Sequence, residues 1–418
     1  MTEPLALPEL DDSSFADAVH RLLAVVRTQL GMQVAWVSEF IGSDQVLRFV
    51  DAEDGADAPE EGTTLPLGGS FCTRVLDGRF PGAIPDARGV PEAALLDVTA
   101  ALHIGSYVGV PLLGPQGVAN GMLCAISDRA SPDLTERDVA SMTLLAGVLH
   151  DLQKRALSHA EAARRHEALR FLVRAVVEGE GRHAVLQPIV DLVTGEAVAA
   201  EGLTRFTLPS PTGLDAAPPV LRSAAQWFDD AGRLGLRHEL EVATAEAVLD
   251  LLEDGTTPDG VAVTVNLGPA TLLSPALEPL LAGRPLDRVV VEISEHAPVS
   301  DYAGLVEALA PYRAVGLRLA VDDCGAGYAS LRHVLATRPD MVKVDMALTR
   351  GADGDLARRT LLHALSTFAD TVGCRLVAEG VETQAELTAV AACGVHLAQG
   401  YLLGKPSRDP RWSGFPAP

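Results

Sequence analysis

The stretch of sequence that decides the fold is Leu319-Ala-Val-Asp-Asp-Cys-Gly-Ala-Gly-Tyr-Ala-Ser-Leu331. It begins as a short apolar run typical of a β-strand and ends in two adjacent carboxylates, Asp322 and Asp323. Adjacent like charges repel each other unless a cation neutralises them. The glycines that follow allow a tight turn and close approach to a ligand. Because an Asp pair alone is more often a solvated turn, the interpretation depends on what the neighbouring strands carry.

Other short apolar runs in the same half of the chain alternate with helical stretches. Such an alternation indicates a parallel sheet, because parallel strands need a long crossover connection. About eight runs within ~230 residues predict a (β/α)8 barrel of the TIM type. The runs begin at Ala184, Ala197, Val261, Val289, Leu317, Met341, Arg375 and Val395.

Several of these runs end in an acid, an amide or a lysine. In a (β/α)8 barrel the chemistry takes place at the carboxyl ends of the strands, so these side chains are expected to converge on one barrel mouth. A buried glutamate is costly unless it is paired or bound to a metal. Oxygen ligands without a Cys or His cluster favour hard cations, Mg²⁺ or Mn²⁺. The strand ends carry Glu201, Asn266, Glu292, Glu295, Asp322, Asp323, Lys343, Asp345, Glu379 and Gln399.

Length and composition limit the possible function classes. A chain of 418 residues is long for one domain, so two domains are expected. The formal net charge of −23 argues against a nucleic-acid polymer as partner, because a polyanion would be repelled. Five cysteines without a CxxC pair fit free thiols in a reducing compartment. The chain shows neither a secretory leader nor a membrane-length apolar run, and we expect a cytoplasmic protein without membrane contact.

The first half has a different order of elements. Apolar side chains at helical spacing predict a helix over 14–30. Residues 34–40 and 45–50 are typical of two antiparallel strands, and a second strand pair is expected over 106–112 and 118–127. A helix, antiparallel strands and a closing helix within ~140 residues predict an α+β domain of the size of a sensor domain.

A long helix is predicted between the two halves. It begins at Thr135, with Asp138 at the capping-box position. Residues 150–172 contain neither Gly nor Pro, so the helical pattern continues. This helix either pairs with its twin from a second subunit or stands as an exposed single helix. The predicted organisation is a sensor domain over 13–152, a helical linker over 153–175 and a barrel over 176–410.

Four motifs of the first half resemble the GAF family: Gly68-Gly-Ser-Phe-Cys, Ile84-Pro-Asp-Ala, Gly105-Ser-Tyr-Val-Gly-Val-Pro-Leu and Gly121-Met-Leu-Cys-Ala-Ile-Ser. The resemblance implies an antiparallel sheet with helices. GAF domains bind cyclic nucleotides, tetrapyrroles, haem or another GAF domain, and the ligand here stays unknown. Cys72 and Cys124 suggest thiol attachment or redox chemistry, but the favoured interpretation is that both are small buried apolar side chains.

The second half carries eight motifs in order: Gln187-Pro-Ile-Val-Asp-Leu, Glu201-Gly-Leu-Thr-Arg-Phe, Val265-Asn-Leu, Glu292-Ile-Ser-Glu, Asp322-Asp-Cys-Gly-Ala-Gly-Tyr-Ala-Ser-Leu, Lys343-Val-Asp, Ala378-Glu-Gly-Val-Glu-Thr and Gln399-Gly-Tyr-Leu-Leu-Gly-Lys-Pro. From about residue 175 to 408 the chain thus resembles the EAL domain, a family of cyclic di-GMP phosphodiesterases. The resemblance implies metal-dependent hydrolysis of cyclic di-GMP to linear pGpG, with a GAF domain as regulator. It also leads us to expect a homodimer.

The resemblance implies a role for each matching residue. Glu201, Asn266, Glu292 and Asp322 would bind the first metal ion, and Asp323 would bind or bridge the second, supported by Asp345. Glu295 would hold the loop 322–328. Lys343 would orient the attacking water or stabilise charge, and Glu379 would act as general base or bind the water network. The dinucleotide would contact Gln187, Leu203, Arg205, Gln399 and Tyr401, with Arg205 near a phosphate.

Three positions depart from the family pattern. Gly202 replaces the usual Ala of the Glu-Ala-Leu signature, Cys324 replaces a Phe, and Ala326 replaces a Thr. Because the acids and the lysine are present, we expect altered tuning of an active enzyme. The alternative is a catalytically inactive cyclic di-GMP receptor or scaffold that signals through the GAF domain. An enolase-like metal lyase on a similar barrel would leave the Gln187 and Gln399 motifs unexplained.

Overall fold

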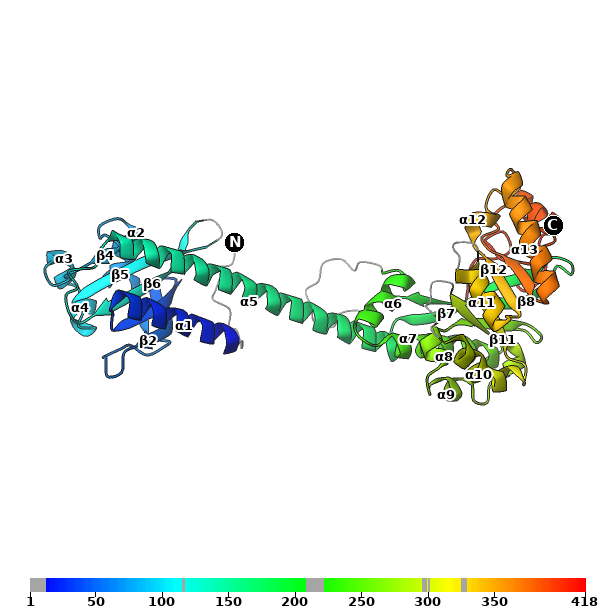
Figure 1. Cartoon of the computed structure of the whole chain (residues 1–418), viewed down its shortest axis with the longest axis horizontal. Helices are drawn as coiled ribbons and strands as arrows, with labels where there is room; N and C mark the ends of the chain where they lie inside the picture. The colour runs from blue at the N-terminus through cyan, green and yellow to red at the C-terminus, as the bar shows by residue number, and fades with distance from the viewer. Residues whose placement is uncertain (1–12, 115–116, 208–221, 295–298, 300, 325–328) are drawn as a thin grey trace. The chain divides into compact units, whose positions relative to one another are not determined.

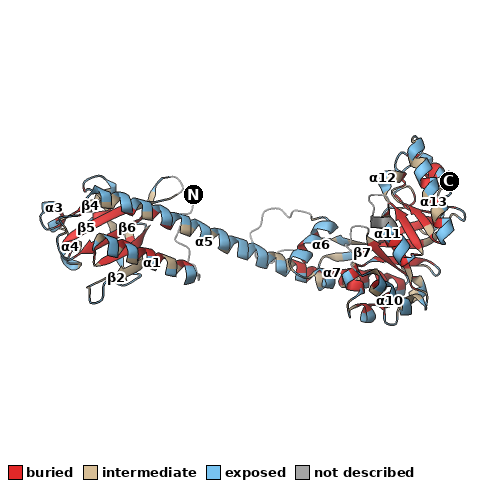
Figure 2. Cartoon of the chain, in the orientation of Figure 1, coloured by how far each residue is buried: buried red, intermediate tan, exposed pale blue. Residues whose placement is uncertain are grey.

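The computed structural model describes residues 13–114, 117–207, 222–294, 299, 301–324 and 329–418. The chain divides into two compact units, residues 1–166 and residues 167–418 (Figure 1). In both units the strands are largely buried and the helices are exposed on their outer faces (Figure 2). No helix in these described ranges combines the length with the apolar character that a membrane span requires.

The first unit is built on a six-stranded antiparallel sheet with the order β3-β2-β1-β6-β5-β4. This confirms the predicted α+β domain with its two strand pairs. The strands are β1 (Val34–Ile41), β2 (Asp44–Ala52), β3 (Thr64–Pro66), β4 (Ala83–Ile84), β5 (Ser106–Leu113) and β6 (Ala119–Ser127). The helices are α1 (Ser13–Leu30), α2 (Phe71–Leu76), α3 (Pro91–Ala94), α4 (Asp97–Ala101) and α5 (Glu136–Val177).

Strand alternation gives this sheet two apolar faces. On β6, Leu123 and Ala125 face a core that is closed by α1 and the first turns of α5. Met122 and Cys124 face the other core, which α2 and the segments around α3 and α4 cover. The sheet is therefore covered on both faces, and side chains of either face are shielded from water.

Helix α5 runs for 42 residues without a break. At its start the backbone N–H of Thr135 donates to Oδ2 of Asp138 at 2.7 Å, which is the predicted capping contact. Residues 161–168 of this helix are all exposed (Figure 2). Pairing with a second copy stays a prediction, as do the domain boundaries.

The second unit is a closed eight-stranded barrel with the order β10-β11-β12-β13-β14-β7-β8-β9. Its strands are β7 (Arg182–Asp191), β8 (Ala197–Phe206), β9 (Ala262–Asn266), β10 (Val289–Ser294), β11 (Arg318–Cys324), β12 (Met341–Val344), β13 (Arg375–Ala378) and β14 (Leu397–Ala398). The helices are α6 (Ala224–Arg233), α7 (Arg237–Glu253), α8 (Pro269–Leu272), α9 (Leu277–Leu281), α10 (Tyr302–Arg313), α11 (Ala329–Thr337), α12 (Met346–Thr349), α13 (Leu356–Val372) and α14 (Gln384–Ala392).

The barrel differs from the expected all-parallel sheet in one strand. β7 runs antiparallel to both of its neighbours, β8 and β14. Only residues 192–196 separate β7 from β8, and a connection of this length closes a hairpin but is too short for a crossover helix. As a consequence, the residues of β7 approach the barrel mouth in reverse order, and Gln187 pairs in register with Glu201.

One apolar layer fills the interior of the barrel. It contains one buried residue from each of the eight strands, so the barrel is a packed core and not a pore. The residues are Ile189, Ala199, Ala262, Val290, Ala320, Met341, Val377 and Leu397.

Candidate metal and catalytic site

A polar ring lies directly above the apolar layer, because side chains two residues apart on a strand point to the same side. Each member follows its strand's apolar residue by two positions toward the mouth, or precedes it on the reversed β7. The ring therefore needs no special backbone geometry; it follows from the strand period. Its members are Gln187, Glu201, Thr264, Glu292, Asp322, Lys343, Glu379 and Gln399.

Lys343 of β12 is the cation of this ring, and its side chain is only 2% exposed. Its Nζ lies 2.7 Å from Oε1 of Glu379 and 3.0 Å from Oδ1 of Asp322. It also lies 3.2 Å from Oε2 of Glu292 and 3.4 Å from Oε1 of Glu201. A single ammonium thus faces carboxylates from four strand ends, and it cannot neutralise them all.

The pKa values reflect this imbalance. Burial raises the pKa of Glu292 well above its ordinary value; Lys343 opposes the rise, and the neighbouring carboxylates add to it. Burial likewise raises the pKa of Glu379 to about 7, against the attraction of Lys343. Burial alone would lower the pKa of Lys343, but the four surrounding carboxylates raise it well above the ordinary value. The lysine therefore keeps its proton, while Glu379 titrates near neutrality.

Two groups of carboxylates are close enough to hold cations. Oxygen atoms of Glu201, Glu292 and Asp322 lie within 4.8 Å of one another, and so do those of Asp322, Asp323 and Glu379. The groups share Asp322. Oε1 of Glu292 is buried and has no hydrogen-bond partner among the described residues, so a cation bound there would satisfy an otherwise costly buried acceptor. The donor set is all oxygen, and it fits hard divalent cations.

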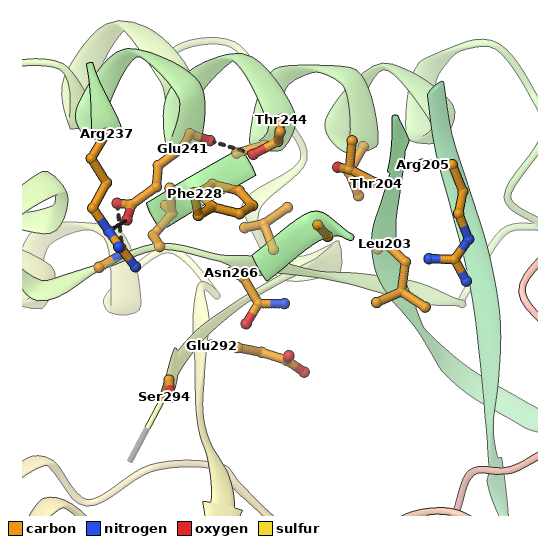
Figure 3. Close-up of a pocket in the computed structure, with 17 residues that line it drawn as sticks. Leu203, Thr204, Arg205, Phe228, Arg237, Glu241, Thr244, Asn266, Glu292 and Ser294 are labelled. Atoms are coloured by element: carbon orange, nitrogen blue, oxygen red, sulfur yellow. Dashed lines mark hydrogen bonds and ion pairs between the residues drawn. The ribbon is translucent and has the colours of Figure 1, made fainter. Parts of the chain in front are cut away.

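Asn266 lies beside these groups. It ends β9 and pairs in register with Glu292 of β10. Figure 3 shows its side-chain amide next to the Glu292 carboxylate. The amide oxygen is a neutral ligand of the kind that hard cations accept.

Adjacent residues of a regular strand point to opposite faces, yet Asp322 and Asp323 join one carboxylate group. The backbone explains this. The β11–β12 pairing shifts register between Val321 and Cys324, and Asp323 takes a left-handed conformation with φ of 60°. Its N–H donates to Oδ1 of Asp322 at 3.0 Å. Such a conformation is uncommon for a residue other than glycine and concentrates at functional sites.

Two glutamines support the ring. Nε2 of Gln399 donates to Oε1 of Gln187 at 3.0 Å and also to Oε2 of Glu201. Nε2 of Gln187 donates to the backbone oxygen of Gly404 at 2.9 Å. In this arrangement the glutamines orient the Glu201 carboxylate, a contact that the sequence did not predict.

A cavity of about 310 Å³ opens beside Asn266 and Glu292 (Figure 3). Leu203 and Arg205 of β8, which were predicted to contact substrate, line it. Its remaining lining includes side chains that the sequence analysis did not select, because α6 and α7 give no signal beyond ordinary barrel helices: Phe228, Arg237, Glu241 and Thr244.

The remaining predicted residues lie apart from the ring or outside the described residues. Asp345 caps α12, where its Oδ1 accepts from the N–H of Ala347 at 2.7 Å, and neither carboxylate group includes it. Tyr401 is 56% exposed, with Nζ of Lys405 5.4 Å from its ring centroid. Glu295 and Ala326 lie outside the described residues.

Comparison with models of known protein families identifies the family of each domain. Residues 170–406 match the model of the EAL domain, and residues 14–149 match the model of the GAF domain. The chain belongs to the EAL family. Its EAL domain follows a GAF domain, as the motifs predicted.

Individual relatives agree with this assignment. A cyclic di-GMP phosphodiesterase of Pseudomonas aeruginosa is 28% identical over 250 residues, which is 57% of this chain and 40% of that protein. An uncharacterized protein of Mycobacterium tuberculosis is 29% identical over 241 residues, 56% of this chain and 38% of that one. The chain thus spans less than half the length of these curated relatives.

A solved structure shows the same barrel. The FimX EAL domain of Xanthomonas citri, in complex with cyclic di-GMP, has a TM-score of 0.50 and 18% identity. The match covers 58% of this chain and 95% of that one. At this identity the likeness concerns the fold of the EAL domain.

Proposed function

We propose that the chain hydrolyses cyclic di-GMP to linear pGpG with two divalent cations, Mg²⁺ or Mn²⁺, at the mouth of the EAL barrel. The observation that carries the proposal is the pair of carboxylate groups that share Asp322 beside the buried Lys343. The name of the Pseudomonas aeruginosa relative and the ligand of the FimX domain supply the substrate class.

The chain's own residues divide into two metal sites. Glu201, Asn266, Glu292 and Asp322 would hold the first cation, and Asp323, with support from Asp345, the second. The unpartnered Oε1 of Glu292 and the uncompensated carboxylates fit this assignment. When bound, such a pair of cations neutralises the phosphodiester and lowers the pKa of water.

Glu379 and Lys343 would act on the attacking water. A general base works best when its pKa lies near the operating pH, and the pKa of Glu379 is raised to about 7. Its carboxylate accepts the proton of the water molecule. The ammonium of Lys343, which keeps its proton, holds the water in line and offsets the negative charge that develops on it.

The cavity beside Glu292 would take part of the dinucleotide. In this assignment Arg205 donates to a phosphate, because guanidinium groups match phosphate geometry. Leu203 contacts a base, and Gln187, Gln399 and Tyr401 border the rest of the ligand. Glu295, which is not among the described residues, would hold the loop 322–328.

A binding-only function is the second candidate, and the substituted loop favours it. Cys324 is 2% exposed and packs in the apolar cluster between β11 and α13, where a larger aromatic is usual for the family. Cys324 directly follows Asp323 at the end of β11. A protein of this kind would bind cyclic di-GMP uncleaved and signal through the GAF domain. In either case we propose that the chain works as a homodimer.

The deciding experiment incubates the purified protein with cyclic di-GMP and Mg²⁺ or Mn²⁺ and follows pGpG by chromatography. Glu201→Ala and Glu379→Ala should abolish the product. Glu278→Ala, at an exposed position of α9, is the matched control and should leave it unchanged. Binding without any product in the parent would overturn the hydrolase and leave the receptor.

A further inference from the structure

Three buried side chains of the GAF domain meet in its core, and the proposed function uses none of them. Sγ of Cys72 lies 3.8 Å from Sγ of Cys124, although the two residues are 52 positions apart in the chain. The hydroxyl of Tyr107 lies 3.4 Å from Sγ of Cys124 and 3.8 Å from Sγ of Cys72. All three residues are at most 3% exposed.

The fold makes room for this group. Cys72 comes from α2, Tyr107 from β5 and Cys124 from the facing strand β6. Gly109 follows Tyr107 by two positions and pairs with Cys124 in register. A Cβ atom at Gly109 would lie 2.1 Å from the Tyr107 hydroxyl and 3.1 Å from Sγ of Cys124. Only glycine at this position allows the phenol to reach the two thiols.

We propose that Cys72 and Cys124 form a redox-active dithiol, which a small hydroperoxide such as hydrogen peroxide oxidises to a disulfide. A disulfide bond is about 2 Å long. The two sulfur atoms, which lie 3.8 Å apart, must therefore move about 2 Å closer to form it. The interpretation as two separate buried apolar cysteines accounts for each residue alone. It does not account for their meeting at a shared tyrosine hydroxyl.

The surroundings distinguish the two thiols. The hydrogen bond from Cys124 lowers the pKa of Cys72 against the opposing effect of burial, and Tyr107 and Gln45 lower it further. Burial raises the pKa of Cys124 well above its ordinary value. Because the thiolate is the nucleophile, Cys72 attacks first and Cys124 second.

The reaction balances in two steps. The Cys72 thiolate attacks one peroxide oxygen; the S–O bond forms, the O–O bond breaks, and the leaving hydroxide takes up a proton as water. The Cys124 sulfur then attacks the sulfenic acid of Cys72; the S–S bond forms, the S–O bond breaks, and the departing hydroxide leaves as water with the Cys124 proton. Two thiols and one hydrogen peroxide give one disulfide and two water molecules.

The test uses the full-length reduced protein and does not depend on the barrel's activity. After exposure to hydrogen peroxide, free thiols are alkylated under denaturing conditions and the peptides are mapped by mass spectrometry without reductant. We expect a peptide pair linked through Cys72 and Cys124, lighter by two hydrogen atoms and separated by dithiothreitol. Cys374 and Cys393, buried cysteines of the EAL domain, serve as internal controls and should be alkylated.

Two variants test the order of events. Cys124→Ala removes the second thiol, so the Cys72 sulfenic acid should accumulate and be trapped by dimedone; it should form more slowly than in the parent, because the Cys124 hydrogen bond that lowers the pKa of Cys72 is lost. Tyr107→Phe removes the hydroxyl and should slow oxidation, because a hydrogen bond that lowers the pKa of Cys72 is lost. If Cys72 and Cys124 of the parent are both alkylated after peroxide treatment, or if Cys72 is overoxidised without a cross-link, the proposal is wrong. The parent protein alone gives this answer, so a misfolded variant cannot obscure it.

Discussion

Nζ of Lys343 lies 2.7 Å from Oε1 of Glu379, which directly follows the neighbouring strand β13, and this contact joins the cation of the polar ring to its proposed base. The lysine also contacts the carboxylates of both predicted metal sites through Asp322, 3.0 Å away. It therefore affects the charge balance of the folded barrel as well as the chemistry.

Replacement of Lys343 by methionine should separate these two effects. Loss of a buried partner leaves unpaired carboxylates, at a cost of about 3–5 kcal/mol, so the metal-free variant should melt well below the parent. Mn²⁺ should restore much of the difference, because the cation replaces the lost positive charge. Turnover should stay reduced by about 10²–10⁴-fold. Melting curves in EDTA and in Mn²⁺ measure the first effect, with the exposed Lys154→Met as control. If variant and parent were equally stable in EDTA, Lys343 would not be offsetting the charge of the neighbouring carboxylates.

The raised pKa of Glu379 predicts a pH dependence of stability in the metal-free protein. Its pKa rises from 4.5 to about 7 on folding. The native state therefore binds a proton more tightly than the unfolded state, and the stability contributed by this residue is present below pH 4.5 and lost as the pH rises to about 7.

Glu379→Gln should remove that loss. Relative to the parent, the free energy of unfolding of the variant should increase by up to about 3 kcal/mol as the pH rises through this range. Melting midpoints of both proteins in EDTA across the range measure the difference. A constant difference at every pH would show that Glu379 does not titrate in this way.

Replacement of Gln399 should weaken metal binding, although Gln399 is not one of the proposed metal ligands. Its amide orients the Glu201 carboxylate and ties it to Gln187. Partners of this kind are worth about 10–100-fold in metal affinity. Gln399→Met should raise the Mn²⁺ concentration needed for half-maximal pGpG formation by that factor, whereas Gln384→Met, on the exposed side of α14, should not. An unchanged metal requirement would assign Gln399 to substrate contact alone.

Much of this site was predictable because a strand has a period of two. Once the eight apolar runs were placed in a barrel, polar residues at their ends had to converge, and Glu201, Glu292, Asp322 and Lys343 do. The family motifs then supplied the chemistry.

What the sequence could not predict depends on contacts between distant segments. The reversal of β7 follows from the short connection 192–196, which permits a hairpin but does not by itself distinguish a strand of the barrel from an added one. The left-handed Asp323 and the meeting of Cys72 with Cys124 have no local signal, since neighbouring strands and helices impose them. Glu241 of α7 accepts from the N–H of Gly268 at 3.0 Å and thereby holds the segment after Asn266, again through tertiary packing alone.

Gly202 is the departure from the Glu-Ala-Leu signature, and the structure shows a packing constraint at this position. A Cβ atom at this position would lie 2.3 Å from Cγ1 of Val248 on α7 and 2.5 Å from the backbone oxygen of Thr264 on β9. Glycine therefore lets α7 pack tightly against the barrel beside Glu201.

Restoring the usual alanine by Gly202→Ala should destabilise the barrel by about 1–3 kcal/mol, the cost of overpacking a filled core. The double variant Gly202→Ala, Val248→Ala should recover only part of this loss, because the contact with the Thr264 oxygen remains and a valine side chain has been removed. Melting midpoints of the single and double variants measure the coupling. A single variant as stable as the parent would show that α7 can move away from β8, and that the glycine is not required by packing.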